Sequence, residues 1–366
     1  MNDDFCTGIP EVKSDAERMK EIKKVTSEAG DWVRDHLVPS KLILERSSND
    51  APAAMNIISL PAWLAVAERA GVPMVEAREI ASMRTVDYIL AMDNLGKEAE
   101  IEAFSEKIVS QLKDGEILRL EQVAPGDVKY ELSQGNSLSG SNPSSPATNG
   151  LIRGSDGKLF PDIFGERFYT TLLDLGHDTI RAFARPFIQP LVATGTFPRG
   201  SERDGVWPVE FRVFVKDGEI TGIANYYRQM DLDDQANIPD DIIKSAVNRS
   251  LEATRAMIAT MYELGMTVDN KAMSDSFKDR GWKWGGMDFT LDFLQAEDGR
   301  VLFLEGGPPG LHYADPCAFL TEGAERIHLN GVALSTLRAP ISLEDWEAGF
   351  MRPDAFSKSV DIEPEL

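Results

Sequence analysis

The chain has 366 residues and carries 38 basic against 60 acidic side chains, a formal net charge of −22. An acidic field of this size repels phosphate backbones, so extended nucleic-acid binding is not expected, although a local basic cleft could hold one nucleotide. No apolar run approaches the roughly 18 residues of a membrane span, and the acidic N-terminus lacks the apolar segment of a secretory signal. Cys6 and Cys317 have no partners at metal-binding spacing. We therefore expect a cytoplasmic protein with no membrane partner and no disulfide framework.

Residues 1–115 are expected to form an N-terminal α/β lobe. A charged helix is predicted to open at residues 14–17, and the apolar runs at 42–44 and 55–58 are predicted to be short strands. Pro61 favours the first turn of another helix, and Gly71 suits its end.

A second unit is predicted over residues 116–180. Within it, 13 of the 17 residues at 133–149 are Ser, Gly, Pro or Asn, which is typical of a loop or linker. This loop could join two units, or it could be a flap that closes over a site.

From residue 181 the chain is rich in predicted strands, and residues 181–340 are taken as a third unit. A long helix is predicted over 241–264, with an apolar stripe formed by five of its residues and an end at Gly265. Residues 341–366 are rich in Asp, Glu and Pro and are expected to form an acidic C-terminal tail.

Asp217-Gly218 predicts the first of two β-hairpins, because this pair suits a two-residue type I′ turn. The register counted from this turn places Arg212 opposite Ile223 and Glu210 opposite Asn225. These side chains lie on a mixed face of the sheet, which is either a solvated outer face or a functional one.

Asp298-Gly299 predicts the second hairpin, and its register places Asp292 directly opposite Glu305. Cross-strand neighbours lie about 4.5–5.5 Å apart at Cβ, so two carboxylates at this position repel each other. A divalent cation between them would relieve the repulsion, and Mg²⁺ commonly combines one or two carboxylates with substrate phosphates. Alternatively, one of the acids pairs with a nearby Lys or Arg.

Three stretches resemble the ATP-grasp superfamily. "LDFLQAEDGRVLFLEGG" is similar to its Asp…Gly-Lys/Arg…Glu-x-Asn hairpin, "VEFRVFVKDGEITGIANYY" to its Glu-x-Arg-x-Phe-Val hairpin, and "ARPFIQPLV" to its hinge strand. "ILRLEQVAPGDVKYEL" further resembles a segment of the cell-division-cycle proteins that assemble a translation initiation factor. A poorly characterised, phage-associated ATP-grasp group is equally similar. The resemblance implies an α+β fold in which two α+β lobes, here 116–180 and 181–340, clasp ATP.

The resemblance also implies the roles of individual residues. Asp292 and Glu305 would hold Mg²⁺, with Gly307 standing where a third ligand is expected unless Asp288 or water replaces it. The nucleotide would be bound by Arg119, Lys129, Arg185, Phe187, Ile188, Glu210 and Arg212, of which Lys129 and Arg212 would also serve catalysis. Arg153 and Lys158 are an alternative to Arg119 and Lys129. Arg185 could instead form a salt bridge, and Phe187 and Ile188 could belong to the core.

The implied activity is ATP- and Mg²⁺-dependent joining of a carboxylate to an amine through an acyl phosphate. The alternative is an ATP-binding assembly factor or chaperone for a protein partner, with little or no ligase turnover. The carboxylate, the amine and any protein partner are not identified by the sequence.

Overall fold

The computed structural model describes residues 53–92, 95–121, 150–153, 157–161, 178–196, 204–227, 231–232, 238–270, 284–309, 326–329 and 340–352, with isolated positions at 24, 163, 331–332, 334 and 337. The expected helix at 14–17, the strand at 42–44, the loop at 133–149 and Lys129 lie outside these ranges. Within them, no helix is long and apolar enough to cross a membrane.

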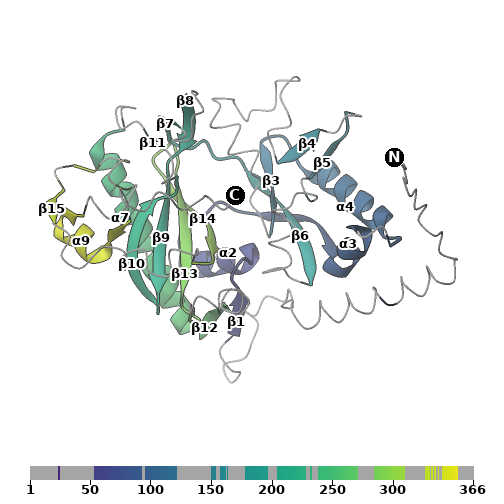
Figure 1. Ribbon diagram of the computed structural model, residues 1–366, viewed down its shortest axis with the longest axis horizontal. Coiled ribbons are helices and arrows are strands. Elements are labelled where there is room, and N and C mark those ends of the chain that lie inside the picture. Colours follow the sequence, from purple (N-terminus) through teal and green to yellow (C-terminus); the bar gives the residue numbers. More distant parts are fainter. Residues whose placement is uncertain are drawn as a thin grey trace, which may run out of the picture.

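A five-stranded antiparallel sheet, in the order β14-β13-β9-β10-β16, forms the centre of one half of the molecule (Figure 1). Its strands are β9 (Glu210–Lys216), β10 (Glu219–Asn225), β13 (Phe289–Gln295), β14 (Val301–Gly307) and β16 (Ile341–Ser342). The helices α7 (Asp240–Glu263) and α2 (Leu60–Arg69) pack against it and share one apolar core with it. The predicted apolar stripe of the long helix is buried in this core: Ile243, Val247, Leu251, Ile258 and Met261.

A three-stranded antiparallel sheet, in the order β2-β6-β3, forms the other half (Figure 1). It consists of β2 (Arg78–Arg84), β6 (Thr179–Pro186) and β3 (Glu116–Leu120), with α3 (Thr85–Met92) and α4 (Glu98–Gln111) packed beside it. Its separate core includes Tyr88, Phe104 and Ile108. Because each sheet has its own buried core, the described chain forms two α+β units.

Smaller elements complete the described fold. Strand β1 (Ala53–Asn56) pairs in parallel with β12 (Met266–Asp269), and β7 (Val192–Thr196) lies between β8 (Asp204–Pro208) and β11 (Asp231–Leu232). Two further pairs are β4 (Leu151–Arg153) with β5 (Leu159–Pro161), and β15 (Ile327–His328) with β17 (Phe350–Met351). The short helix α9 (Leu343–Ala348) separates β16 from β17.

The strand pairing crosses the domain boundaries expected from the sequence. Strand β2 lies in the expected lobe 1–115, yet it pairs with β6, which spans the expected boundary at residue 180. Strand β1 pairs with β12, more than 200 positions later in the chain. The expected acidic tail begins with β16, which pairs Ile341 with Ile223 of β10. The amino-acid composition of a segment indicates whether it is exposed to solvent, but it does not indicate which distant strand the segment pairs with.

The first hairpin has the predicted turn but not the predicted register. Asp217 and Gly218 have φ values of 52° and 79°, as a type I′ turn requires, and Lys216 pairs with Glu219. A bulge between Ile220 and Gly222 then shifts the pairing, so that Arg212 lies opposite Ala224 and not Ile223. The extra residue of a bulge moves every later pair by one position, which a count from the turn does not detect.

In the second hairpin the predicted opposition of Asp292 and Glu305 is confirmed, although the turn differs. The loop contains three residues, 297–299, and Ala296 donates its backbone N–H to Arg300 O (2.8 Å). Phe293 pairs with Phe303, and a register shift after this pair restores the opposition of the acids. Val301 and Phe303 lie in the apolar core.

Candidate functional site

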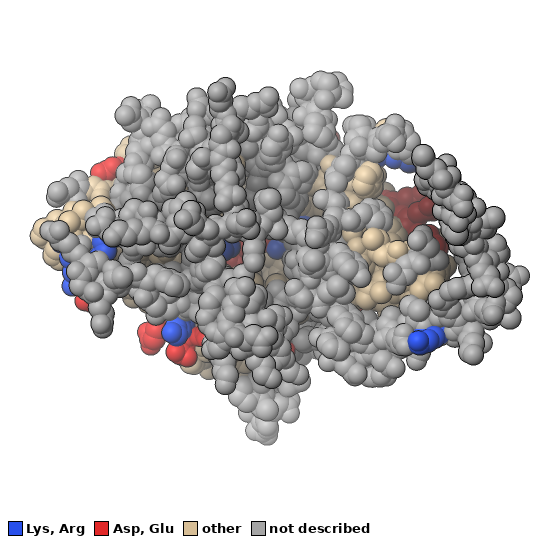
Figure 2. All heavy atoms as spheres, viewed as in Figure 1, with Lys and Arg blue, Asp and Glu red and all other residues tan. Residues whose placement is uncertain are grey.

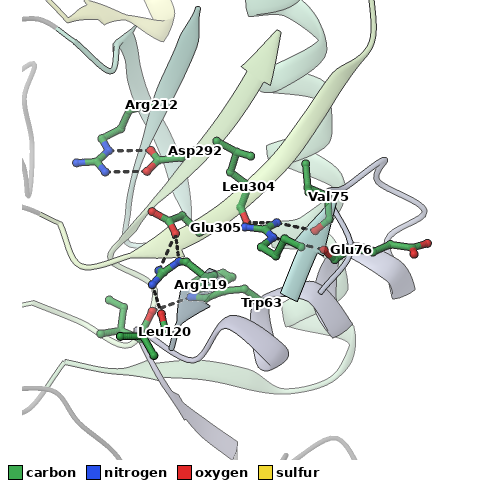
Figure 3. Close-up of polar contacts among 11 residues, drawn as sticks. Trp63, Val75, Glu76, Arg119, Leu120, Arg212, Asp292, Leu304 and Glu305 are labelled. Carbon is green, nitrogen blue, oxygen red and sulfur yellow. Dashed lines mark hydrogen bonds and ion pairs between the residues drawn. The ribbon is translucent and has the colours of Figure 1, made fainter. Parts of the chain in front are cut away.

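Arg212, Asp292 and Glu305 form one row across three neighbouring strands. Asp292 on β13 lies opposite Arg212 of β9 on one side and opposite Glu305 of β14 on the other. Arg212 donates Nε and Nη2 to the two carboxylate oxygens of Asp292, at 2.8 and 2.7 Å (Figure 3). The Asp292 side chain is 5% exposed, whereas that of Arg212 is 27% exposed. This bidentate pair therefore lies at the edge of the buried region, with the guanidinium on the solvent side.

The surroundings of Arg212 favour its charged form. Burial lowers the pKa of this guanidinium, but the charge of Asp292 and its hydrogen bonds more than offset that, and the pKa is raised. The ring of Tyr226 lies 4.6 Å from the guanidinium carbon, at cation–π distance. Among the described residues, Nη1 of Arg212 donates no hydrogen bond, so it remains able to contact an anion.

Arg119 reaches Glu305 from the other sheet. It lies on β3, and it donates Nη2 and Nε to Glu305 Oε2 at 2.7 and 3.1 Å, while its Nη1 contacts Leu120 O (Figure 3). Both side chains are largely buried, with exposures of 10% and 21%. The two halves of the molecule thus meet through an ion pair at the carboxylate that was predicted to bind metal. Both acidic and basic atoms are visible near the middle of the face in Figure 2.

Arg185 is buried and is bonded to the backbone. It lies near the end of β6, is 5% exposed, and donates Nη2 to Val75 O (2.5 Å) and Leu304 O (3.0 Å) and Nε to Glu76 O (3.4 Å). Burial and the charge of Arg119 lower its pKa to about 10, and Glu305 opposes that shift. Arg185 thus donates to three backbone carbonyls, those of Val75, Glu76 and Leu304.

Glu210 precedes Arg212 by two positions on β9 and lies opposite Leu294. It is 5% exposed, and Tyr227 donates its hydroxyl to it at 3.3 Å. Glu210 and Arg212 therefore present opposite charges on the same face of the sheet, as the alternation along the strand predicted.

Phe187 and Ile188 lie in the segment between β6 and β7. Phe187 donates its backbone N–H to Gly115 O (2.8 Å), and the Ile188 side chain is partly buried against a small cluster of Val75, Ala296 and Leu302. The segment follows β6 and also contacts the central sheet, because Leu191 donates its backbone N–H to Gln295 O (2.8 Å).

Both acids are paired with arginines in this structure, Asp292 with Arg212 and Glu305 with Arg119, which is the alternative to metal binding that the sequence left open. The same residue types would also suit a divalent cation accompanied by polyphosphate. Carboxylate oxygens suit Mg²⁺, and the forked donors of Arg119 and Arg212 suit phosphate oxygens. The described residues contain no group of three His, Cys, Asp or Glu side chains that could hold a metal on their own. Asp288 does not supply a third ligand, because its carboxylate accepts the backbone N–H of Asp217 (2.6 Å) and of Gly285 (2.5 Å).

Sequence reasoning missed several residues around the site. Trp63 of α2 is fully buried against Gly306, and Glu121 is a fully buried acid that accepts a hydrogen bond from Ser59 (3.1 Å). Tyr226, under Arg212, was also missed. The sequence signal for Glu121 was available, since it follows the apolar strand that carries Arg119, but the partners of Trp63 and Tyr226 are set by tertiary packing.

Comparison with known proteins finds similar solved structures. No family model and no curated protein matches the chain. The macrocyclase MdnC of Microcystis aeruginosa MRC, bound with precursor peptide MdnA, is 12% identical over 83% of this chain and 66% of its own, with a TM-score of 0.26. Cdc123 of Schizosaccharomyces pombe is 14% identical over 71% and 87% of the two chains, with a TM-score of 0.32.

The VanG D-Ala:D-Ser ligase of Enterococcus faecalis is 12% identical over 71% of this chain and 56% of its own, with a TM-score of 0.29. This chain therefore spans less than two thirds of the macrocyclase and of VanG. All three are ATP-grasp proteins, the superfamily that the hairpin motifs resemble.

Proposed function

We propose that this chain binds ATP with Mg²⁺ in an ATP-grasp fold and uses it to join a carboxylate to an amine. The observation that carries the proposal is the row Arg212, Asp292 and Glu305, reached from the other sheet by Arg119. It combines two oxygen ligands for a hard cation with two guanidinium groups for phosphates, in a partly buried setting where electrostatic contacts are strengthened.

In this proposal each side chain of the site has a separate role. Asp292 and Glu305 would hold Mg²⁺, which when bound would neutralise charge on the phosphates. Arg212 would use Nη1 to contact the transferred phosphoryl group and hold it in position, and Arg119 would contact the phosphates from the opposite half. Lys129, which lies outside the described residues, is proposed as a third cation. Phe187 and Ile188 of the hinge segment would contact adenine, and Glu210 would orient the bound nucleotide.

The proposed reaction has two steps. A substrate carboxylate oxygen bonds to the γ-phosphorus as ADP leaves, which gives an acyl phosphate. The amine then attacks the acyl carbon and phosphate departs, so that an amide is formed. The chain lowers the barrier by positioning and by fixed positive charge, since phosphoryl transfer requires little covalent chemistry from the protein.

An ATP-binding assembly factor is the second candidate. Gly307 favours it, because this position offers no side-chain ligand for a further cation. Such a protein would bind ATP at the same residues without consuming it and would capture a protein partner in stoichiometric amounts.

Nucleotide binding is tested with Asp292→Asn and Glu305→Gln. Wild-type protein should be stabilised against heat by ATP with Mg²⁺, by about 2.7 kcal/mol at 100 times Kd. Each variant should bind the metal–nucleotide complex at least about 10- to 100-fold more weakly, the loss typical even of residues that only support a metal ligand.

Matched controls are Asp298→Asn, an exposed acid in the same hairpin, and Glu347→Gln, an exposed acid paired with Arg255. Both should bind like wild type. If ATP with Mg²⁺ does not stabilise the wild-type protein, both candidate functions are wrong. ADP release with pooled carboxylates and amines, lost in the two site variants, separates the ligase from the assembly factor.

A further inference from the structure

The β14 strand contains one extra residue beside the proposed metal ligands. Phe293 pairs with Phe303, and the residue before it, Asp292, pairs with Glu305. Leu304 therefore has no partner on β13 and forms a bulge in the ladder. Side chains alternate between the faces of a strand. If the pairing continued from Phe293 and Phe303 without the register shift, Asp292 would lie opposite Leu304 and Glu305 would point toward the apolar core. The bulge is therefore what places both acids on one face.

Arg185 holds this bulge. A bulged residue loses its ladder partner, and a buried carbonyl without a hydrogen bond is costly. The Leu304 carbonyl accepts from Nη2 of Arg185, and the same nitrogen donates to Val75 O. Arg185 thus joins two backbone segments through one nitrogen, Nη2.

The residues on either side of Leu304 are also held. Phe303 donates its N–H to Pro73 O (2.9 Å) and accepts from Val75 N–H (3.0 Å). On the other side, a Cβ at Gly306 would lie 2.2 Å from the Trp63 ring, so the strand touches α2 directly. With both flanks fixed, the contact at Leu304 decides where the extra residue sits.

We propose that Arg185 is a positioning residue for Glu305, acting through the Leu304 carbonyl to keep the bulge that sets Glu305 opposite Asp292. The inference rests on the proposed function, in which the two acids bind a divalent cation. It assigns Arg185 to the geometry of the metal site and leaves contact with the nucleotide to Arg119 and Arg212.

The test uses Mn²⁺ with adenylyl imidodiphosphate, a non-hydrolysable ATP analogue, and counts free Mn²⁺ by electron paramagnetic resonance. Arg185→Met removes the hydrogen bonds and retains an unbranched side chain. It should weaken Mn²⁺ binding by about 10- to 100-fold, while affinity for the metal-free analogue changes less than about twofold. Arg185→Lys, which can reach one carbonyl, should lose less. Arg78→Met, in the same sheet but paired with Glu116, is the control and should match wild type.

A double-variant cycle with Glu305→Gln separates positioning from general stability. If Arg185 acts through Glu305, its replacement should add less than about twofold once Glu305 is gone. The same loss in both backgrounds, or Mn²⁺ binding by Arg185→Met within twofold of wild type, would overturn the inference alone. No Mn²⁺-dependent binding in the wild type would overturn the proposed function as well. Should Arg185→Met fail to fold, Arg185→Lys decides: unchanged Mn²⁺ affinity contradicts the inference and a weaker one supports it.

Discussion

Gly306 and Gly307 are adjacent on β14, but they differ in how much space a side chain would have. A Cβ at Gly306 would lie 2.2 Å from Cε2 of Trp63, which is fully buried and is held by a hydrogen bond to Ile57 O (2.7 Å). At Gly307 the nearest atom to such a Cβ would be Thr290 Oγ1, at 3.8 Å. Neither glycine has a positive φ, so the difference between them is one of space.

We therefore expect Gly306→Ala to destabilise the protein by about 1–3 kcal/mol, the usual cost of overpacking. Gly307→Ala, the matched control, should change stability by less than about 0.5 kcal/mol. Urea unfolding of both variants at one pH measures the difference. Equal stability of the two variants would contradict the contact between α2 and β14.

The first turn of helix α3 contains a buried acid, Asp87, that is paired with two basic side chains. Arg84 donates Nε and Nη2 to Asp87 (2.7 and 2.8 Å), and Lys97 lies 3.6 Å from it. The hydrogen bonds from Arg84 are the main cause that lowers the pKa of Asp87. A carboxyl whose pKa is lowered by folding contributes stability above its unfolded pKa and loses it as the pH falls through the folded value.

Asp87→Asn should therefore flatten the decline of stability below about pH 4, the ordinary value for Asp. Arg84→Gln should flatten it as well, because it removes the main cause of the shift. Urea midpoints measured between pH 2.5 and 7 test this. A decline as steep in Asp87→Asn as in wild type would show that other carboxylates carry the acid sensitivity.

The two hairpins show how far a turn predicts the strands that follow it. Asp217-Gly218 forms the predicted two-residue turn. Because of the bulge near Thr221, however, the cross-strand partner of Arg212 is Ala224 and not the predicted Ile223. At Asp298-Gly299 the loop has three residues, and the extra residue at Leu304 compensates for it, so Asp292 still faces Glu305. Turn chemistry is local, whereas a bulge depends on contacts from other elements, here Arg185 of β6.

At the scale of the whole molecule, Arg119 joins the two sheets at the proposed site. It is the basic side chain by which β3 reaches Glu305, and hydrogen bonds to charged groups contribute about 1.5–3 kcal/mol each. We expect Arg119→Ala to weaken ATP binding by about 10- to 100-fold. Titration calorimetry with ATP and Mg²⁺ measures this loss.

Arg78→Ala is the control for that experiment, since Arg78 belongs to the same sheet and pairs with Glu116, away from the row of Arg212, Asp292 and Glu305. It should bind ATP like wild type. If Arg119→Ala also binds ATP like wild type, the nucleotide does not contact the β2-β6-β3 half, and the proposed clasp is wrong.

Two local features could be read from the sequence alone: the turn at 217–218 and the buried stripe of the helix predicted over 241–264. Periodicity and turn chemistry act over a few residues, so they can be read from a short stretch. Three features depend on tertiary packing: Arg119 and Arg212 each pair with one acid, Arg185 binds backbone carbonyls, and a bulge at Leu304 sets Asp292 opposite Glu305. Arg119 and Glu305 are 186 positions apart, and no local pattern encodes which of several arginines will meet a given carboxylate once two sheets have packed.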